Sequence, residues 1–575
     1  MLKKLLPSLT GYGKYALLTP AMVIIEVILE IFIPLIMAKI IDVGVKNGDI
    51  GYVAKAGAAM VLMAFFALIF GVLSGRFAAV ASMGFAKGIR KKLFDKIQEF
   101  SFANIDRFST ASLITRLTTD VNSVQMAFMM IIRMLVRAPI MLISATVMTI
   151  IINARLAVVF LVAIAVLSAA LYFIATMAYP RFRAMLVRYD SMNASVQENL
   201  IAIRVVKAFV REDHENEKFR EAADAVRKAQ LRAEKIVIST MPIMQFVMYC
   251  CMIAISWFGG RMIISETLLT GEFMSFISYV GQIMMSLMMI SFVFIGIVMS
   301  RASTIRIVEV IDEEIDIKDD SGKDDLKVED GSVVFDNVSF SYSKNIDNLT
   351  LSECSFEIKS GETVGIIGGT GSGKTSLVQL IPRLYDVLEG KVLAGGHDVR
   401  DYSIATLRNA VSVVLQKNVL FSGTIRENLR WGNENATDEE IEEACRSAQA
   451  HDFIMSFPKG YDTDLGQGGV NVSGGQKQRL SIARALLKKP KIIVLDDSTS
   501  AVDTATDSKI RQALRENLKN TTKIIIAQRI ASVSEADKII VMDDGRINAV
   551  GTHEELLAAN SIYREVFESQ QKGVA

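Results

Sequence analysis

Long apolar runs, separated by polar segments, fill roughly the first 300 residues of the chain. Each run approaches or exceeds the roughly 20 residues that a helix needs to cross the hydrocarbon core of a bilayer. The pattern therefore predicts an all-α transmembrane domain over residues 15–310, with six spans and the lipid bilayer as a partner. The spans are expected at roughly 15–41, 56–80, 135–152, 156–179, 238–263 and 273–299.

Positive charge distinguishes the two sides of this predicted domain. Lys and Arg collect in the connections at 87–116 and 181–235, whereas the other connections are short and carry few of them. Because basic segments stay on the cytoplasmic side, both basic connections, the N-terminus and everything after the sixth span should be cytoplasmic. Residues 1–14 (MLKKLLPSLTGYGK) predict a short basic amphipathic helix at the membrane surface.

The N-terminus also bears on the location of the protein. The first long apolar run is too long for a cleavable signal peptide, and no organelle presequence is recognisable before it. We therefore expect a multi-pass protein of a prokaryotic plasma (inner) membrane.

Helical patterning continues far beyond the predicted spans. Residues 53–102 contain few helix-breaking residues, and a helix of that length is about 75 Å long, far more than the bilayer core. The same holds for 156–207 and 218–262, so these helices should project into the cytoplasm. Two short turns interrupt them, at about 103–110 and 209–217, where a cytoplasmic motor could push on the membrane domain.

Four charged residues lie within or beside the predicted spans. Glu26 and Glu30 are one helical turn apart in the first span, where a carboxylate is costly in lipid. They could contact a transported compound, with a tolerance for cations, or form hydrogen bonds between helices. Arg133 and Arg137 flank the inner end of the third span, and we expect them to extend toward the membrane surface.

Methionine is concentrated in the last two spans. Its side chains could simply pack against lipid or neighbouring helices, or they could form an adaptable apolar surface that binds a transported compound. The residues concerned are Met241, Met244, Met248, Met252, Met284, Met285, Met288 and Met289.

A different pattern begins after the sixth span. Residues 311–332 are acidic and polar and predict a solvated linker, whereas residues 333–571 alternate short apolar strands with helices. That alternation is typical of an α/β domain. Within it, KIIVL at Lys491–Leu495 and KIIIA at Lys523–Ala527 are continuous apolar runs, as expected of buried parallel strands.

The segment GGTGSGKT, at Gly368–Thr375, fits the phosphate-binding motif G-x-x-x-x-G-K-[ST]. An apolar strand, Thr363–Ile367, precedes it, and a helix is expected over Ser376–Leu384. Backbone N–H groups of such a loop turn toward phosphate oxygens, while Lys374 neutralises phosphate charge and Thr375 ligates Mg²⁺. The predicted nucleotide contacts are Gly368, Gly369, Thr370, Gly371, Ser372, Gly373, Lys374, Thr375 and Ser376.

Both apolar runs end at residues that should meet this loop. Asp496 and Asp497 follow the first run, and Gln528 follows the second. Ligands of parallel sheets lie at the carboxyl ends of the strands, so these side chains should converge on the phosphates. An aspartate at the end of such a strand is suited to hold Mg²⁺.

Several motifs in the α/β region resemble those of the ATP-binding-cassette (ABC) transporters. VSGGQ at Val472–Gln476 looks like the family signature, and Gln416 in VVLQKNVLF looks like its Q-loop glutamine. Ser500–Asp503 (SAVD) resembles the D-loop, and Tyr342 in VSFSY resembles the aromatic residue that stacks on adenine. The order and spacing of these motifs fit the family throughout 333–571.

The resemblance extends to the first half, which looks like the membrane domain of an exporter half-transporter of the multidrug or lipid-exporter type. It implies that the nucleotide is ATP and that Thr375, Gln416 and Asp496 hold Mg²⁺. It also implies that two cassettes dimerise head to tail and that the turns at 103–110 and 209–217 are coupling regions. The signature residues that would then contact the partner's ATP are Ser473, Gly474, Gly475 and Gln476.

Two residues depart from the family pattern at the predicted chemistry. Asp497 is found where the family usually has the glutamate that polarises water, and Gln528 where it usually has histidine. The shorter side chain withdraws the carboxylate by about 1 Å, a misplacement that can cost roughly a hundredfold in rate. With Gln416, these are the predicted catalytic residues. We expect a degenerate site that binds ATP and hydrolyses it slowly; the alternative is drift in a site that is still active.

The predicted function is ATP-driven export of amphipathic or hydrophobic compounds by alternating access. The chain resembles the degenerate-site subunit of a bacterial heterodimeric ABC exporter, so its partner should be a different half-transporter. The alternative is a regulatory ATP-binding subunit that gates a hydrolytically competent partner. A net charge of +1 gives no basic field for nucleic acid, and the four cysteines lack metal spacing and should be reduced.

Overall fold

The computed structural model describes residues 2–319, 326–497 and 502–572 of the chain. The chain forms two compact units, which are described separately. The first unit comprises residues up to Gln98 and Thr110–Glu313; the second comprises Glu99–Ser109 and everything from Glu314 onward.

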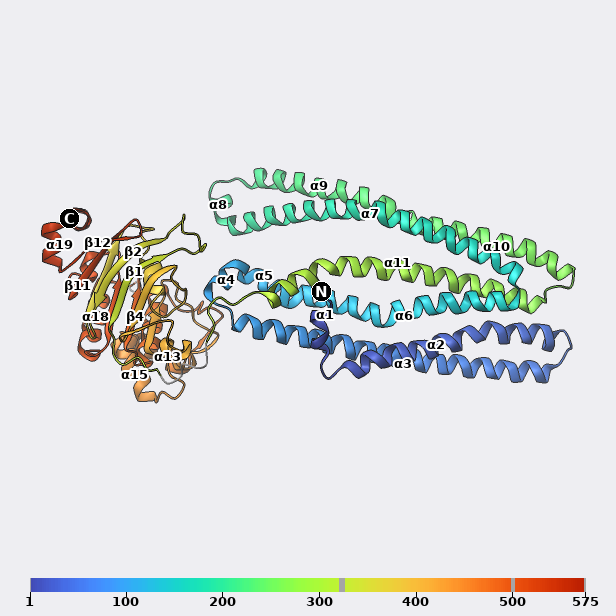
Figure 1. Ribbon diagram of the computed structural model, residues 1–575, viewed down its shortest axis with the longest axis horizontal. Coiled ribbons are helices and arrows are strands. Elements are labelled where there is room, and N and C mark those ends of the chain that lie inside the picture. Colours follow the sequence, from blue (N-terminus) through green and yellow to red (C-terminus); the bar gives the residue numbers. More distant parts are fainter. Residues whose placement is uncertain (1, 320–325, 498–501, 573–575) are drawn as a thin grey trace. The chain divides into compact units, whose positions relative to one another are not determined.

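Long helices make up the first unit (Figure 1). Among the described residues, six helical segments are long and apolar enough to cross a membrane, which confirms the predicted six-span, all-α domain. The elements are α1 (Leu2–Leu5), η1 (Leu6–Leu9), α2 (Gly13–Lys39), η2 (Ile40–Val45), α3 (Ile50–Gln98), α5 (Thr110–Thr115), η3 (Arg116–Asp120), α6 (Val121–Ile152), α7 (Ala154–Ile201), α8 (Ile203–Ala208), α9 (Glu212–Ile238), α10 (Thr240–Ile264) and α11 (Thr270–Asp312).

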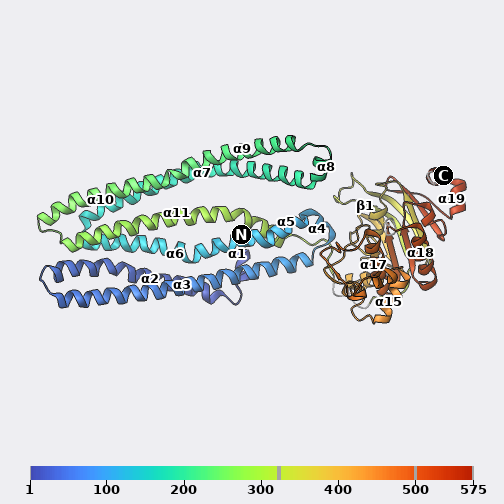
Figure 2. The ribbon, with the colours of Figure 1, turned by 180° about the vertical axis from the view of Figure 1, so that it is seen from behind.

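Neighbouring helices of this unit run side by side, and views from both sides show the same pairs: α2 with α3, α6 with α11, and α7 with α9 and α10 (Figure 2). Buried apolar side chains fill the space between them, and the rings of Phe160 and Phe276 stack with centroids 5.7 Å apart. Pro34 lies inside α2 and cannot donate a backbone hydrogen bond. Hydroxyls from α11 bond to carbonyls near it: Tyr279 donates to Ile31 (2.8 Å) and Ser275 to Pro34 (2.7 Å).

Two of the predicted long helices are interrupted. Within 156–207, α7 ends at Ile201 and α8 begins at Ile203. The sequence pattern predicts a continuous helix over 218–262, whereas α9 ends at Ile238 and α10 begins at Thr240. Pro242 explains the interruption, because its ring would clash with the carbonyl one turn earlier in an unbroken helix. The break also separates a strongly charged segment from an apolar one.

Charged side chains form an ion cluster inside the first unit. Arg137 of α6 donates hydrogen bonds to two glutamates of α2. One goes to Glu26, and the others go to the two carboxylate oxygens of Glu30, at 2.9 and 2.7 Å. Gly71 of α3 makes room for the cluster, since a Cβ there would lie 2.9 Å from Glu26 Oε1. The prediction that Arg137 extends toward the membrane surface is therefore wrong, because two carboxylates in an apolar environment stabilise its charge. Of the two alternatives for the glutamates, polar contact between helices is the one observed.

The second unit is an α/β domain built on two main sheets, as predicted. A four-stranded antiparallel sheet has the order β2-β1-β4-β5, and a six-stranded sheet has the order β12-β11-β3-β10-β9-β6. In the larger sheet β11, β3, β10, β9 and β6 are parallel and β12 is antiparallel. The strands are β1 (Val333–Phe340), β2 (Leu351–Ile358), β3 (Thr363–Gly368), β4 (Glu389–Ala394), β5 (His397–Asp398), β6 (Val411–Val414), β7 (Gly423–Thr424), β8 (Asp464–Leu465), β9 (Ile492–Asp496), β10 (Thr522–Ile526), β11 (Lys538–Asp543) and β12 (Arg546–Gly551).

Helices flank these strands. The predicted helix after the phosphate-binding loop ends earlier than expected, at Gln379, and turns lead on to Pro382. Val328 is buried in the core of this unit, although the polar segment 311–332 that contains it predicts a solvated linker. The helices are α4 (Phe102–Phe108), α12 (Lys374–Gln379), α13 (Ile404–Ala410), α14 (Ile425–Arg430), α15 (Asp438–Ser447), α16 (His451–Met455), α17 (Gly474–Leu487), α18 (Thr504–Asn517), α19 (His553–Ala559) and α20 (Ser561–Lys572).

The short helix α4 belongs to the second unit although it follows α3 directly in the chain. Ser101 caps its N-terminus by accepting a hydrogen bond from the backbone N–H of Asn104, whose side chain bonds back to Ser101. The Asn104 amide also donates to the carbonyl of Glu314 (2.9 Å). A capping box of this kind fixes the start of a helix that is too short to be stable alone.

The ion cluster leads to a stability prediction. Replacing Arg137 with methionine leaves Glu26 and Glu30 without a counter-charge, and breaking a buried ion pair costs about 3–5 kcal/mol. We expect a clear fall in the Tm of the purified protein and a recovery of Tm when Glu26→Gln and Glu30→Gln are added.

A matched control is Arg220→Met, which removes an ion pair whose side chains are 81% and 63% exposed. Exposed pairs of this kind contribute about 0–1 kcal/mol. An Arg137→Met protein as stable as the control would contradict the assigned role of the cluster.

Candidate functional site

Three parallel strands bring the predicted site residues to one edge of the larger sheet. Ile526 of β10 pairs with Ile366 of β3 on one side and with Asp496 of β9 on the other. The three strands therefore end at the same level, and the segments that follow them lie next to one another. This is the arrangement that the apolar runs predict.

At two positions of the segment Gly368–Thr375 there is no room for a side chain. Gly373 has a left-handed φ of 90°, and a Cβ there would lie 2.7 Å from Leu351 Cδ2. A Cβ at Gly368 would lie 2.3 Å from the carbonyl oxygen of Met542. The loop can therefore follow this path only with glycine at these positions, which leaves the first N–H groups of α12 directed toward a ligand.

Lys374 lies across this loop. Its ammonium donates to the carbonyl oxygens of Gly368 (2.9 Å) and Gly369 (2.7 Å). Burial lowers the pKa of Lys374, although Asp496 and Asp497 act in the opposite direction. A partly desolvated ammonium gains more from an incoming phosphate than an exposed one would.

Two oxygen-bearing side chains, from β9 and α12, are in contact at the candidate metal position. Thr375 Oγ1 donates to the two carboxylate oxygens of Asp496 at 3.2 and 3.0 Å. Asp496 is only 2% exposed, and burial raises its pKa, opposed by the Thr375 hydroxyl and reinforced by the charge of Asp497. A hydroxyl beside a buried carboxylate fits the preference of Mg²⁺ for oxygen ligands, so these residues fit the expected ion.

Of the three predicted catalytic residues, both glutamines contact Asp497. Asp497 Oδ2 accepts a hydrogen bond from Gln528 Nε2 at 2.9 Å and a longer one from Gln416 Nε2 at 3.5 Å. Both amides thus converge on a single carboxylate oxygen. The sequence predicts that the three are neighbours, but it does not predict that the glutamines hold the carboxylate.

Tyr342 lies against the start of α12. Its hydroxyl is 2.8 Å from Ser376 Oγ, and it also donates to Gln379 Oε1 at 3.4 Å. Its side chain is 47% exposed, so its ring is accessible for stacking while its hydroxyl is held. Tyr385 lies edge to face with it, a neighbour that the motifs do not indicate because Tyr385 belongs to none of them.

The signature residues form the N-terminus of α17. Ser473 Oγ accepts from the backbone N–H of Gln476 (3.3 Å), and the Gln476 side chain accepts from the backbone N–H of Ser473 (2.8 Å). Gly474 and Gly475, in the first turn, have backbone N–H groups that such a helix start presents to an anion. No hydrogen bond between described residues joins these four to the loop Gly368–Thr375.

The predicted D-loop is only partly described, since Ser500 and Ala501 lie outside the described residues. Its last residue, Asp503, caps α18 by accepting from the backbone N–H of Thr506 at 2.9 Å.

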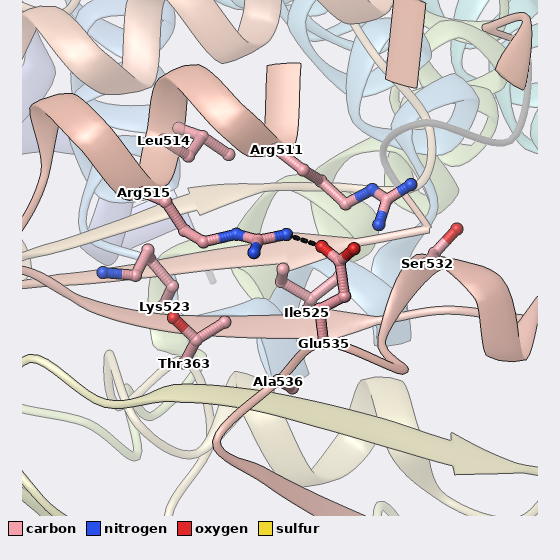
Figure 3. Close-up of a pocket in the computed structure, with 9 residues that line it drawn as sticks. All are labelled: Thr363, Arg511, Leu514, Arg515, Lys523, Ile525, Ser532, Glu535 and Ala536. Carbon is pink, nitrogen blue, oxygen red and sulfur yellow. Dashed lines mark hydrogen bonds and ion pairs between the residues drawn. The ribbon is translucent and has the colours of Figure 1, made fainter. Parts of the chain in front are cut away.

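A small pocket elsewhere in the second unit contains none of the predicted site residues (Figure 3). Arg515 and Glu535 form an ion pair across it, and Arg511 points toward the same glutamate from α18. Arg511 itself bonds to Asp507 and to the carbonyl of Ala531. The basic groups of this pocket are therefore engaged within the unit.

Comparison with known proteins agrees with the geometry. The family described as ABC transporter transmembrane region matches residues 17–287, and the family described as ABC transporter matches residues 351–500. The chain belongs to the ABC transporter family. It joins one membrane domain to one ATP-binding domain, the layout of an exporter half-transporter, and it is an ABC-type ATPase that drives transport with ATP.

Relatives match along most or all of the chain. An uncharacterized ABC transporter ATP-binding protein, YfiB of Bacillus subtilis, is 39% identical over 99% of this chain and 98% of its own length. The ATP-dependent lipid A-core flippase of Syntrophus aciditrophicus is 34% identical over 84% of this chain and 80% of its own. The putative multidrug export ATP-binding/permease protein YgaD of Bacillus subtilis is 33% identical over 99% of both chains.

A solved structure has the same overall fold. The chain is similar to a bacterial Atm1-family ABC exporter with ATP bound, with a TM-score of 0.84 and 26% identity over 97% of this chain and 99% of the other. This similarity, together with the family matches, assigns ATP binding to the second unit.

The contacts of Lys374 predict the effect of removing it. Lys374→Ala deletes the ammonium nearest the phosphate-binding loop, and charge-assisted hydrogen bonds to phosphate are about twice as strong as neutral ones. We expect the affinity for ATP to fall at least about tenfold, measured with a fluorescent ATP analogue on the full-length protein.

Lys391→Ala, at an exposed position of β4, is the control and should bind ATP as the unchanged protein does. Equal affinity in the two variants would show that the loop is not the ATP site.

Proposed function

We propose that the chain is one half of an exporter that moves amphipathic or hydrophobic, drug-like or lipid-like compounds out of the cytoplasm by alternating access. The carrying observation is that a six-span membrane unit shares one chain with an assembled P-loop ATP site. Two relatives support the substrate class by their names, a lipid A-core flippase and a putative multidrug exporter. In this proposal the N-terminus and the second unit are cytoplasmic, on the basis of the positive-inside pattern.

Exposed apolar side chains in the last two spans support an apolar substrate. Met241 and Met285 are exposed, whereas Met244 and Met284 are buried in the core of the first unit. Only the exposed methionines can serve as an adaptable binding surface, and the others stabilise helix packing.

At the ATP site, the contacts support slow hydrolysis. Thr375 and Asp496 would hold Mg²⁺ with Gln416, and the ion would neutralise charge on the phosphates. Asp497 is shorter than the family's glutamate, and its Oδ2 already accepts hydrogen bonds from Gln528 and Gln416. These contacts orient the carboxylate toward the two amides and leave fewer acceptor positions for a water molecule. The groups that bind ATP, Lys374 among them, are untouched by either change.

Two features support assembly with a second half-transporter. The helix start at Ser473–Gln476 is an anion site with no hydrogen bond to the described loop of its own chain, so it suits the ATP of a partner. After α8, Phe209 and Val210 are 73% and 81% exposed. Apolar side chains this exposed are suited to contact a partner. Because a homodimer would carry two slow sites, we propose a heterodimer with a competent partner.

The proposal predicts that activity can be restored at this site. In the full-length chain, Asp497→Glu with Gln528→His lengthens the carboxylate and removes one amide that holds it. We expect ATPase turnover to rise at least about tenfold, because a 1 Å misplacement costs up to roughly a hundredfold. Lys374→Ala in the same background should abolish the gain.

The same measurement tests the slow site, on which the proposal of a heterodimer rests. The unchanged chain alone should turn over slowly, and turnover equal to that of the double variant would refute the slow site. A regulatory role is the second candidate, favoured by the engaged Asp497 carboxylate. The regulatory role would be supported by two results together. ATP binding at this site would change the ATPase rate of the partner, and the assembled pair would move no fluorescent amphiphile across the membrane of proteoliposomes.

A further inference from the structure

A row of aromatic residues connects α4 with the start of the phosphate-binding helix. Tyr385 follows α12 and is 9% exposed, and its ring lies 6.1 Å from Phe102 of α4 and 5.1 Å from Tyr342. The rings of Tyr385 and Tyr342 are nearly perpendicular, at 89°. Edge-to-face pairs at this separation are favourable and sensitive to tilt.

The hydroxyl of Tyr385 fixes the ring to α4. It donates a hydrogen bond to Asp106 Oδ2 at 2.7 Å. Burial, reinforced by the bond to Asp106, raises the pKa of Tyr385 well above its ordinary value, so the hydroxyl remains a donor. Hydrogen bonds to a carboxylate are stronger than neutral ones, which makes this the most specific contact between α4 and the row.

Tyr342 is held from three directions. Its hydroxyl contacts Ser376 of α12, and its ring is perpendicular to Tyr385 and tilted by 77° from Phe340 of β1. Phe340 and Ser376 are fixed by the core of the unit, since they are 3% and 7% exposed. Of the three contacts that hold Tyr342, the one with Tyr385 depends on α4, because Tyr385 is bonded to Asp106. In the sequence, α4 lies between α3 and α5, which belong to the membrane unit.

We propose that Asp106 and Tyr385 are positioning residues that set the tilt of Tyr342, so that α4 tunes the affinity of the site for the base of the nucleotide. The inference rests on the proposed function, in which Tyr342 stacks on adenine. The inference extends the proposed function by assigning a role in base recognition to Asp106 and Tyr385, which belong to none of the motifs. Coupling between two sites is reciprocal. If the position of α4 changes the affinity for the base, binding of the base must therefore shift the equilibrium between positions of α4 by the same factor.

The test compares ATP with inorganic triphosphate, which fills the phosphate loop but has no base. Tyr385→Phe removes one hydroxyl and keeps the ring. In the full-length chain in lipid nanodiscs, we expect its Kd for ATP to rise about three- to tenfold, because the variant weakens only part of the roughly 5- to 150-fold that base stacking contributes. The Kd for triphosphate should be unchanged.

Variants at Asp106 provide a second test. Asp106→Ala should reproduce the loss of ATP affinity, and Asp106→Asn, which keeps an acceptor oxygen, should restore most of it. Tyr402→Phe is the matched control: its buried hydroxyl donates to the carbonyl of Ala394 at 2.7 Å in the same unit, so removing it should alter neither Kd.

A double-mutant cycle decides whether Tyr385 acts through Tyr342. In a Tyr342→Ala background, adding Tyr385→Phe should leave the Kd for ATP unchanged. The inference is overturned if Tyr385→Phe weakens ATP and triphosphate equally, weakens neither, or still weakens ATP after Tyr342 is removed. If the unchanged protein bound no ATP, the proposed function would fall as well, so the two failures are distinguishable.

Discussion

The register of three parallel strands is the constraint on which the nucleotide site depends. Because β3, β10 and β9 pair without a shift, the phosphate loop, Gln528 and the Asp496–Asp497 pair emerge at one edge. A slip of one residue would turn every side chain of a strand to the opposite face. These strands are buried on both faces. Their continuous apolar sequences are stable only in a parallel sheet whose two faces are both covered by other parts of the domain. Core packing thus determines where these side chains meet.

The proposed function assigns ATP binding and ATP hydrolysis to different groups at this edge. Lys374 and the loop N–H groups act on phosphate charge, and they are positioned by backbone geometry that glycine alone permits at Gly373. In the proposed function the water-polarising group is a single side chain, Asp497, whose Oδ2 accepts hydrogen bonds from two amides. A change of one methylene can therefore reduce hydrolysis without disturbing the loop. This separation is why a slow site is compatible with tight ATP binding.

Local patterns were sufficient to predict much of this molecule. Apolar run length gave the six spans, and the strand–loop–helix context of Gly368–Thr375 indicated an ATP-binding domain. Contacts between distant segments could not be predicted. Nothing in the sequence near Arg137 shows that Glu26 and Glu30 lie opposite, and nothing near Asp106 shows that it meets Tyr385. Such pairings depend on which helix faces pack together, and periodicity predicts that a face is buried but not which partner covers it.

Polar contacts also bias which helices of the membrane unit can separate. Arg137 joins α2 to α6, and Tyr279 and Ser275 join α11 to α2. In an apolar environment each contact that is broken leaves polar groups without partners, at a cost of about 1–3 kcal/mol per group. The proposed alternating access requires some helices of the membrane unit to move apart. The least costly separations are between helices that meet through apolar side chains alone, because lipid can replace those contacts at little cost. The helices α2, α6 and α11 should therefore move together as one body.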